Sequence, residues 1–146
     1  MRLTSEGSKL TRMKILLTSS EAVPFAKVGG LADVVGSLPS ALRNLDVDAR
    51  VIIPGYGHID HIEYEIRPLF QFNFQHSQGN SQVSIFTCMY NDIPFYFLQV
   101  WPYFGQEGTV YTYWNWDMER FVFFNQAVMA TIWELNARLG WSPDVV

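Results

Sequence analysis

One stretch of the chain, residues 19–39 (SSEAVPFAKVGGLADVVGSLP), gathers residue types that could bind an anion directly after a run of aliphatic residues. Its candidate residues are Glu21, Lys27, Gly29, Gly30 and Asp33. Two adjacent glycines before a helix let the backbone approach a ligand closely and leave N–H groups pointing outward. The helix dipole adds partial positive charge at that point, and Lys27 adds a full one. This combination suits a phosphate group.

The stretch matches neither of the common glycine-rich phosphate motifs. Lys27 precedes the glycines and no Gly-Lys-Ser/Thr follows, so the stretch is not a Walker A motif, and its spacing is not G-x-G-x-x-G. The simpler alternative is a tight turn that glycine permits, beside a solvated Lys27. Glu21 and Asp33 would then be solvated as well, or Asp33 would cap the following helix. The residues alone leave both interpretations open.

The surrounding pattern predicts a strand, a helix and a second strand. Residues 13–20 (MKILLTSS) and 48–54 (DARVIIP) are short apolar runs, which are typical of strands buried on both faces. Apolar residues recur between them at helical spacing: Leu31, Val34, Val35, Leu38, Leu42 and Leu45. Pro39 falls inside this pattern, and we expect it to kink or divide the helix. A β-α-β unit builds a parallel sheet that binds ligands at the carboxyl ends of its strands, where the loop of residues 19–30 begins.

The middle of the chain predicts an antiparallel extension of that sheet. Residues 68–74 (PLFQFNF) alternate between apolar and polar types, and the runs 81–90 and 94–100 flank a short turn as in a hairpin. Residues 101–116 (WPYFGQEGTVYTYWNW) form an aromatic loop with two glycines. Its rings suit either core packing or stacking against the apolar face of a ligand ring.

A second amphipathic helix follows the aromatic loop. Its predicted apolar face consists of Met118, Phe121, Val122, Val128, Met129, Ile132 and Trp133. Asp117 or Asn115 is the expected helix cap. Residues 141–146 (WSPDVV) predict the opening of another parallel strand, as if the chain were cut inside a larger fold.

Length and composition exclude several classes of protein. A chain of 146 residues with 49% apolar and 16% charged residues indicates one globular domain. The net charge of −4, without clustered Lys or Arg, argues against nucleic-acid binding, and no apolar run is long enough to span a membrane. Cys88 stands alone, so we expect a small buried residue rather than a disulfide. His58 and His61 lack the further converging ligands of a metal site, and we expect neither metal nor cofactor.

The first twelve residues differ from the rest of the chain. They are polar and lack the apolar core of a secretory signal peptide. We expect residues 1–12 to form a flexible tail and residues 13–146 to form the folded domain.

A family resemblance sharpens this interpretation. Residues 13–42 (MKILLTSSEAVPFAKVGGLADVVGSLPSAL) resemble, without a gap, the opening of bacterial glycogen synthases and plant starch synthases. That opening has the form K-I-L-x-x-x-S-E-x-x-P-[FY]-x-K-[TV]-G-G-L-[AG]-D-V-[VS]-G-[AS]-L-P. Residues 49–57 (ARVIIPGYG), 118–129 (MERFVFFNQAVM) and 141–146 are similar to later family segments.

The resemblance implies a GT-B architecture, in which two Rossmann-like domains face each other across a cleft. Such enzymes are retaining glucosyltransferases that move glucose from ADP-glucose to the non-reducing end of an α-1,4-glucan. The chain looks like the N-terminal domain of such an enzyme, an α/β fold with a parallel sheet and an antiparallel hairpin extension. The partner domain, a C-terminal Rossmann domain with most of the nucleotide-binding residues, would be missing, so we expect the fragment alone to be inactive. The implied location is the cytoplasm of a bacterium, or the plastid of a plant or alga.

The resemblance also assigns roles to the candidate residues. Lys27 matches the family lysine that approaches the diphosphate and sugar of the donor, and Gly29 and Gly30 match its backbone donors. Asp33 matches an aspartate near the sugar hydroxyls, and Glu21 matches the glutamate that orders the loop. Lys27 and Asp33 are therefore the candidate catalytic residues, and all five are candidates for binding ADP-glucose.

Residues 101–117 depart from the family pattern. The usual D-N-x-x-R-F motif reads WDMERF here, with Trp116 and Asp117 at the first two positions. Tyr111 is the nearest match to an upstream Y-x-D motif, without its aspartate. Tyr111, Trp116 and Asp117 are candidate acceptor-binding residues in a divergent member. Two alternatives to the ADP-glucose enzyme are a non-catalytic glucan-binding or regulatory domain and a glycosyltransferase with another acceptor. The sequence leaves the choice between ADP and UDP in the donor open.

Overall fold

The computed structural model describes residues 11–106 and 108–146. Most of the tail expected at residues 1–12 therefore lies outside the described residues. The remainder is an α/β domain with one five-stranded sheet.

The sheet combines a parallel part and an antiparallel part, as the sequence predicts. Its strands are β1 (Lys14–Thr18), β2 (Asp48–Pro54), β3 (Arg67–His76), β4 (Gly79–Tyr90) and β5 (Ile93–Gln99), in the order β1-β2-β5-β4-β3. β1, β2 and β5 run parallel, whereas β4 pairs antiparallel with both β5 and β3. Asn91 and Asp92 connect β4 to β5 with φ angles of 49° and 62°, the left-handed backbone of a tight two-residue hairpin turn.

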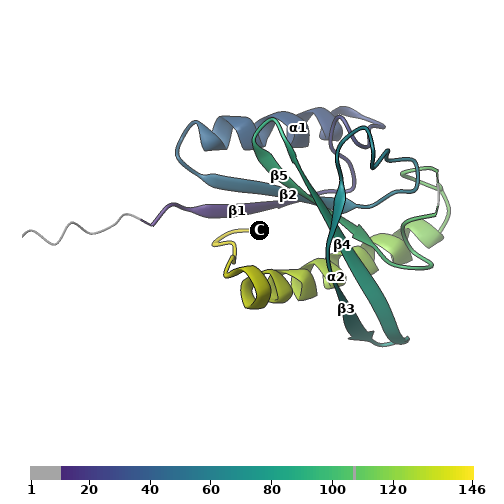
Figure 1. Ribbon diagram of the computed structural model, residues 1–146. Helices are drawn as coiled ribbons and strands as arrows, with labels where there is room; N and C mark the ends of the chain where they lie inside the picture. The colour runs from purple at the N-terminus through teal and green to yellow at the C-terminus, as the bar shows by residue number, and fades with distance from the viewer. Residues whose placement is uncertain (1–10, 107) are drawn as a thin grey trace, which may run out of the picture.

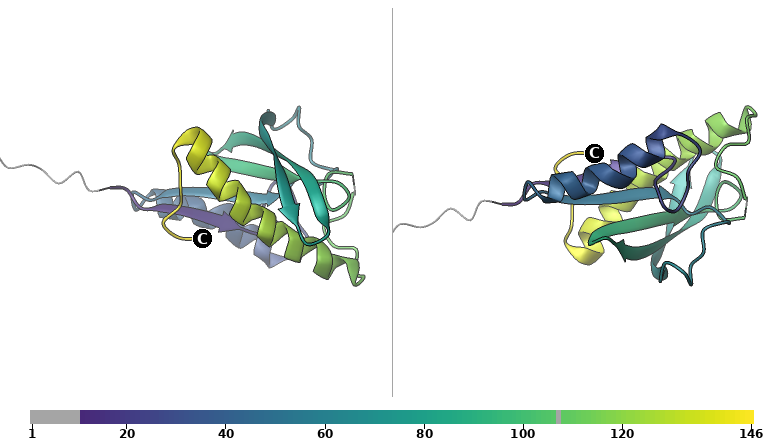
Figure 2. Two further views of the ribbon diagram at one scale, coloured as in Figure 1. Left: turned by 90° about the horizontal axis from the view of Figure 1, so that it is seen from below. Right: turned by 90° about the horizontal axis from the view of Figure 1, so that it is seen from above.

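Two helices cover opposite faces of the parallel strands. α1 (Gly30–Arg43) connects β1 to β2, and α2 (Trp116–Leu139) follows the aromatic loop. Figure 1 shows α1 on one side of the sheet and α2 on the other, and the two views of Figure 2 confirm this three-layer arrangement. The strands between the helices read as continuous apolar runs because both of their faces are covered. Val51, Ile52 and Ile53 of β2 are accordingly fully buried.

The predicted apolar face of α1 is largely wrong. Of its members, Leu31, Val34, Leu38 and Leu45 are exposed, Leu42 is half-buried, and only Val35 is buried. The face of α1 that meets the protein carries Ala32, Val35 and Pro39 instead. Small residues serve here because the helix lies close to the loop before it. A Cβ atom at Gly36 would overlap the side chain of Val23 and lie 3.0 Å from its carbonyl oxygen.

Pro39 does not divide the first helix. α1 runs without interruption from Gly30 to Arg43, with Pro39 buried in its middle. The helix tolerates the missing N–H because burial of the ring compensates for one lost backbone hydrogen bond.

The predicted face of α2 is also partly wrong. Met118, Val122, Met129 and Trp133 are exposed, whereas the buried side consists of Arg120, Phe123, Phe124, Ala127, Val128, Thr131 and Leu135. Both sets follow helical spacing, so periodicity could not separate them. The choice was decided by the fit of the phenylalanine rings into the core and by the burial of Arg120, which apolar patterns do not reveal.

Residues 141–146 lie beside β1, as expected for a further parallel strand, but they form only an isolated bridge. Ile15 pairs with Val145 in parallel, and the N–H of Leu16 donates to the carbonyl of Val145 at 3.0 Å. Cys88 is buried as expected, and burial raises its pKa to about 11, so the thiol is a poor nucleophile at neutral pH. Neither helix of the described chain is long and apolar enough to cross a membrane.

Candidate functional site

The loop after β1 is organised around the carboxylate of Glu21. This side chain is 3% exposed, so the interpretation of Glu21 as a solvated residue is wrong. Its Oε2 atom accepts hydrogen bonds from the N–H groups of Val28, at 2.5 Å, and Gly29, at 3.1 Å. Glu21 thereby folds residues 22–29 back onto the end of the strand, and α1 begins directly after them.

The bond to Glu21 also decides which backbone donors face outward. The N–H of Gly29 is already engaged, so it is not an outward donor in this conformation. The N–H groups of Gly30, Leu31 and Ala32, in the first turn of α1, have no acceptor within the described chain. A Cβ atom at Gly30 would find no atom within 4 Å, so the space above this helix start is open. An open helix N-terminus of this kind attracts anions.

Lys27 and Asp33 meet beside this helix start. The Lys27 ammonium donates to both carboxylate oxygens of Asp33, at 2.6 and 2.8 Å. The two side chains are 52% and 56% exposed. Asp33 lies inside the first turn, and α1 has no side-chain cap, so the helix-cap interpretation of Asp33 is wrong. An exposed ion pair of this kind stabilises a protein by about 1 kcal/mol or less, and a stronger partner could therefore replace it.

Tyr111 connects the first loop to the aromatic loop. Its hydroxyl lies 2.7 Å from the Ser20 hydroxyl and 3.5 Å from Oε1 of Glu21. Burial, together with the nearby Glu21 carboxylate, raises the pKa of Tyr111, so the phenol remains protonated at neutral pH. Tyr111 also lines two hollows of about 290 and 330 Å³, the first lined by Lys27 and His58 as well and the second by Ser20 and Leu31.

Asp117 and Arg120 hold the aromatic loop in place. The carboxylate of Asp117 accepts hydrogen bonds from the N–H and hydroxyl of Thr112 and from the N–H of Tyr113, all at 2.7–3.0 Å. Arg120 is fully buried and donates to Asp117 and to the carbonyls of Tyr103 and Val110, at 3.0, 3.1 and 3.2 Å. Burial by itself would raise the pKa of Asp117, but these hydrogen bonds outweigh it and hold the pKa below 3.8.

These contacts correct the expected cap of α2. Asn115 occupies the cap position, but its side chain makes no capping hydrogen bond, and Asp117 lies inside the first turn. Trp116 is half-buried and stacks on Tyr103, with ring centroids 5.2 Å apart. An acceptor-binding role for Tyr111, Trp116 and Asp117 stays a prediction, and all three have a visible structural role in the loop.

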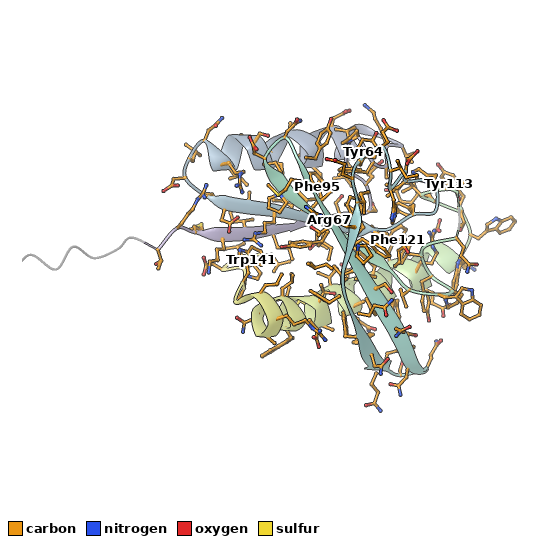
Figure 3. The ribbon with its side chains drawn as sticks, in the orientation of Figure 1. Tyr64, Arg67, Phe95, Tyr113, Phe121 and Trp141 are labelled. Atoms are coloured by element: carbon orange, nitrogen blue, oxygen red, sulfur yellow. The ribbon has the colours of Figure 1, made fainter. Side chains whose placement is uncertain are left out.

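The structure brings the five candidate residues for binding the sugar donor together at one end of the molecule. In Figure 3 Tyr113 lies among the loops at this end, and Trp141 lies at the opposite end of the sheet. The sequence did not indicate a role in this site for Ser20, Arg120 or His58. The His58 ring lies 3.2 Å from the Phe25 carbonyl, which can only accept a hydrogen bond from it. A lone arginine among phenylalanines in MERFVFF was the available indication of a buried cation. Within the described residues, no group of three His, Cys, Asp or Glu side chains could hold a metal ion.

Comparisons with known proteins agree on one family. The family model described as the starch synthase catalytic domain matches residues 14–146. A glycogen synthase from Clostridium kluyveri is 38% identical over 135 residues, which cover 92% of this chain and 27% of that protein. A glycogen synthase from Caldicellulosiruptor bescii is 44% identical over 126 residues, which cover 85% of this chain and 26% of that protein.

A solved structure shows the same fold. The catalytic domain of starch synthase IV from Arabidopsis thaliana, bound to ADP and acarbose, superimposes with a TM-score of 0.76 at 25% sequence identity. The match covers 92% of this chain and 27% of that one. The chain thus spans only about a quarter of the length of the proteins that it matches.

The geometry of the first loop predicts the effect of removing its central carboxylate. Glu21→Ala leaves the N–H groups of Val28 and Gly29 without their acceptor, so we expect a loss of about 1–3 kcal/mol in unfolding free energy. Amide hydrogen exchange at these two residues should accelerate at the same time. Glu134→Ala, which removes a carboxylate from the surface of α2, is the control and should leave both amides unchanged. Unchanged exchange at Val28 and Gly29 in Glu21→Ala would contradict the assignment.

The lowered pKa of Asp117 predicts a pH-dependent stability. Because its folded pKa lies below the ordinary value of 3.8, its contribution to stability is complete above that pH and is lost as the pH falls through the folded pKa. Asp117→Asn should therefore reduce unfolding free energy by about 1–3 kcal/mol at pH 7. In urea titrations, the difference in unfolding free energy between Asp117→Asn and wild type should shrink below pH 3.8. Asp92→Asn in the β4–β5 turn is the control, and a gap that stays constant down to pH 3 would refute the role of Asp117.

Proposed function

The chain belongs to the family of starch synthase catalytic domains, and we propose that it forms the donor-side part of a retaining glucosyltransferase. The reaction transfers glucose from ADP-glucose to the non-reducing end of an α-1,4-glucan. The remaining nucleotide contacts come from a C-terminal Rossmann-like domain. The named relatives are bacterial glycogen synthases, which favours the bacterial cytoplasm over a plastid as the location.

One observation carries the proposal: Glu21 holds the loop so that the open first turn of α1 and the ammonium of Lys27 lie side by side. A nucleotide-sugar diphosphate leaves with growing negative charge when the glucosyl group departs. Donors that are already oriented stabilise that charge without reorganising during the reaction. Gly30 contributes its backbone N–H, and Gly29 contributes by bonding to Glu21 and fixing the turn.

Lys27 and Asp33 exchange partners in this proposal. The diphosphate replaces Asp33 as the partner of Lys27, because a dianion at a helix N-terminus attracts the ammonium more strongly than one exposed carboxylate does. Asp33, once released, accepts hydrogen bonds from the sugar hydroxyls. The exchange requires little free energy because the exposed ion pair contributes about 1 kcal/mol or less to stability.

The non-catalytic alternative explains the loop less well. A domain that only binds glucan has no need of a cation beside an open helix start, since glucan is uncharged. An acceptor other than α-1,4-glucan is compatible with the same donor loop. The acceptor therefore has to be identified by assay.

Lys27→Ala separates the chemical role of this residue from a structural one. In the native protein that contains this chain, kcat with ADP-glucose and glycogen should fall by about 100- to 1000-fold, as for loss of one oriented electrostatic donor. The unfolding free energy should change by about 1 kcal/mol or less. Arg67→Ala, which removes an exposed cation from β3, is the control and should keep the wild-type rate. An unchanged rate in Lys27→Ala would remove this lysine from the mechanism.

The 146-residue chain by itself should not elongate glycogen. It carries the donor loop but not the second Rossmann-like domain that the proposal requires. Incorporation of labelled glucose from ADP-glucose and from UDP-glucose should therefore be at background for the purified chain, whereas the native protein should show activity with one of the two donors. Elongation by the isolated chain would refute this division of the site.

A further inference from the structure

A separate hollow lies between the β3–β4 hairpin and residues 100–106. It measures about 720 Å³, against about 290 and 330 Å³ for the two hollows beside the first loop. It shares no described lining residue with either of them. Its volume falls in the range of about 300–1,000 Å³ that is usual for small-ligand sites.

The lining of this hollow is polar, and its one described histidine, His76, is hydrogen-bonded to the Ser81 hydroxyl at 2.9 Å. Side-chain amides project from the hairpin and from the end of β5, namely those of Gln78, Asn80, Gln82 and Gln99. None of the four amides forms a side-chain hydrogen bond with another described residue. No Asp, Glu, Lys or Arg stands among the described lining residues. Amides both donate and accept, as sugar hydroxyls do, whereas a phosphate or a charged peptide would find no Lys, Arg, Asp or Glu partner among the described lining residues.

An exposed aromatic ring stands at the edge of the same hollow. Trp101 lines it directly after β5 and is 71% exposed. The turn that carries Trp101 is held in place by Tyr103, two residues further on. Tyr103 is buried and stacks on Phe123 with a centroid distance of 4.1 Å. An exposed ring on a well-packed turn offers a flat apolar face to the C–H side of a pyranose.

We propose that this hollow binds a neutral α-glucan chain as a second contact for the acceptor polysaccharide, apart from the donor loop. The amides of Gln82 and Gln99 bind sugar hydroxyls, and Trp101 stacks against a glucose ring. The choice of glucan rests on the proposed function, whereas the preference for an uncharged polyhydroxyl ligand rests on the lining alone. A polymer held here raises the local concentration of chain ends near the cleft.

The test measures binding without the reaction. Calorimetry with maltoheptaose, on the native protein containing this chain and without nucleotide sugar, should show a dissociation constant about three- to tenfold larger in Trp101→Ala, as for loss of one aromatic contact. Trp133→Ala removes a tryptophan that is 73% exposed on α2, outside the hollow, and should bind as wild type does. Gln82→Ala, at an exposed position of β4, should weaken binding about two- to fivefold, and it tests the site even if Trp101→Ala fails to fold.

Kinetics separate this site from the donor loop. In Trp101→Ala the KM for glycogen should rise by a similar factor, and kcat and the KM for ADP-glucose should stay as in wild type. Wild-type binding of maltoheptaose by both Trp101→Ala and Gln82→Ala would overturn the inference while glucose transfer still stood. An equal loss of maltoheptaose affinity in Trp133→Ala would also overturn the inference. Conversely, weakened binding in a protein that transfers no glucose would leave the site intact and refute the proposed function.

Discussion

A carboxylate removed from water needs hydrogen-bond donors, and Glu21 obtains them from the backbone of its own loop. The N–H groups of Val28 and Gly29 converge on one of its oxygens. The chain therefore returns to the end of β1 before α1 begins, and Lys27 is placed at the entrance to the helix. The N–H of Val23 adds a second tie, because it donates to the carbonyl of Ala32 in the first turn of α1 at 3.1 Å. The ion pair, both neighbouring hollows and the contact to Tyr111 depend on that geometry.

The order of the elements followed from the sequence because it rests on local rules. Continuous apolar runs predicted β1 and β2, alternation predicted β3, and two apolar runs flanking a short turn predicted the hairpin of β4 and β5. The faces of the helices were not predictable in the same way. Leu31 and Val34 of α1 continue a correct helical period and are still exposed. Periodicity identifies a stripe but not its partner, and small residues such as Gly36 that permit close packing are invisible to an apolar count.

The candidate site shows the same division. The types and spacing of Lys27, Gly29, Gly30 and Asp33 predicted a common location, and the fold brings them together. Their mutual bonds could not be predicted, because the engagement of the Gly29 N–H by Glu21 depends on the path of a non-repetitive loop. The role of Arg120 is a case of the same kind. A buried guanidinium requires several acceptors, and two of its acceptors are carbonyls 10 and 17 residues away in a loop without regular structure.

The anchoring of the aromatic loop has a consequence for its evolution. Arg120 donates to the main-chain oxygens of Tyr103 and Val110. Asp117 accepts mainly from the N–H groups of Thr112 and Tyr113. Every residue has the carbonyl, and every residue except proline has the N–H. Exposed side chains of this loop, such as that of Trp114, can therefore change while its path persists, whereas the buried Tyr103, Phe104 and Val110 are constrained by the core. The loop is thus a place where sequence can drift and ligand preference can be adjusted without loss of the fold.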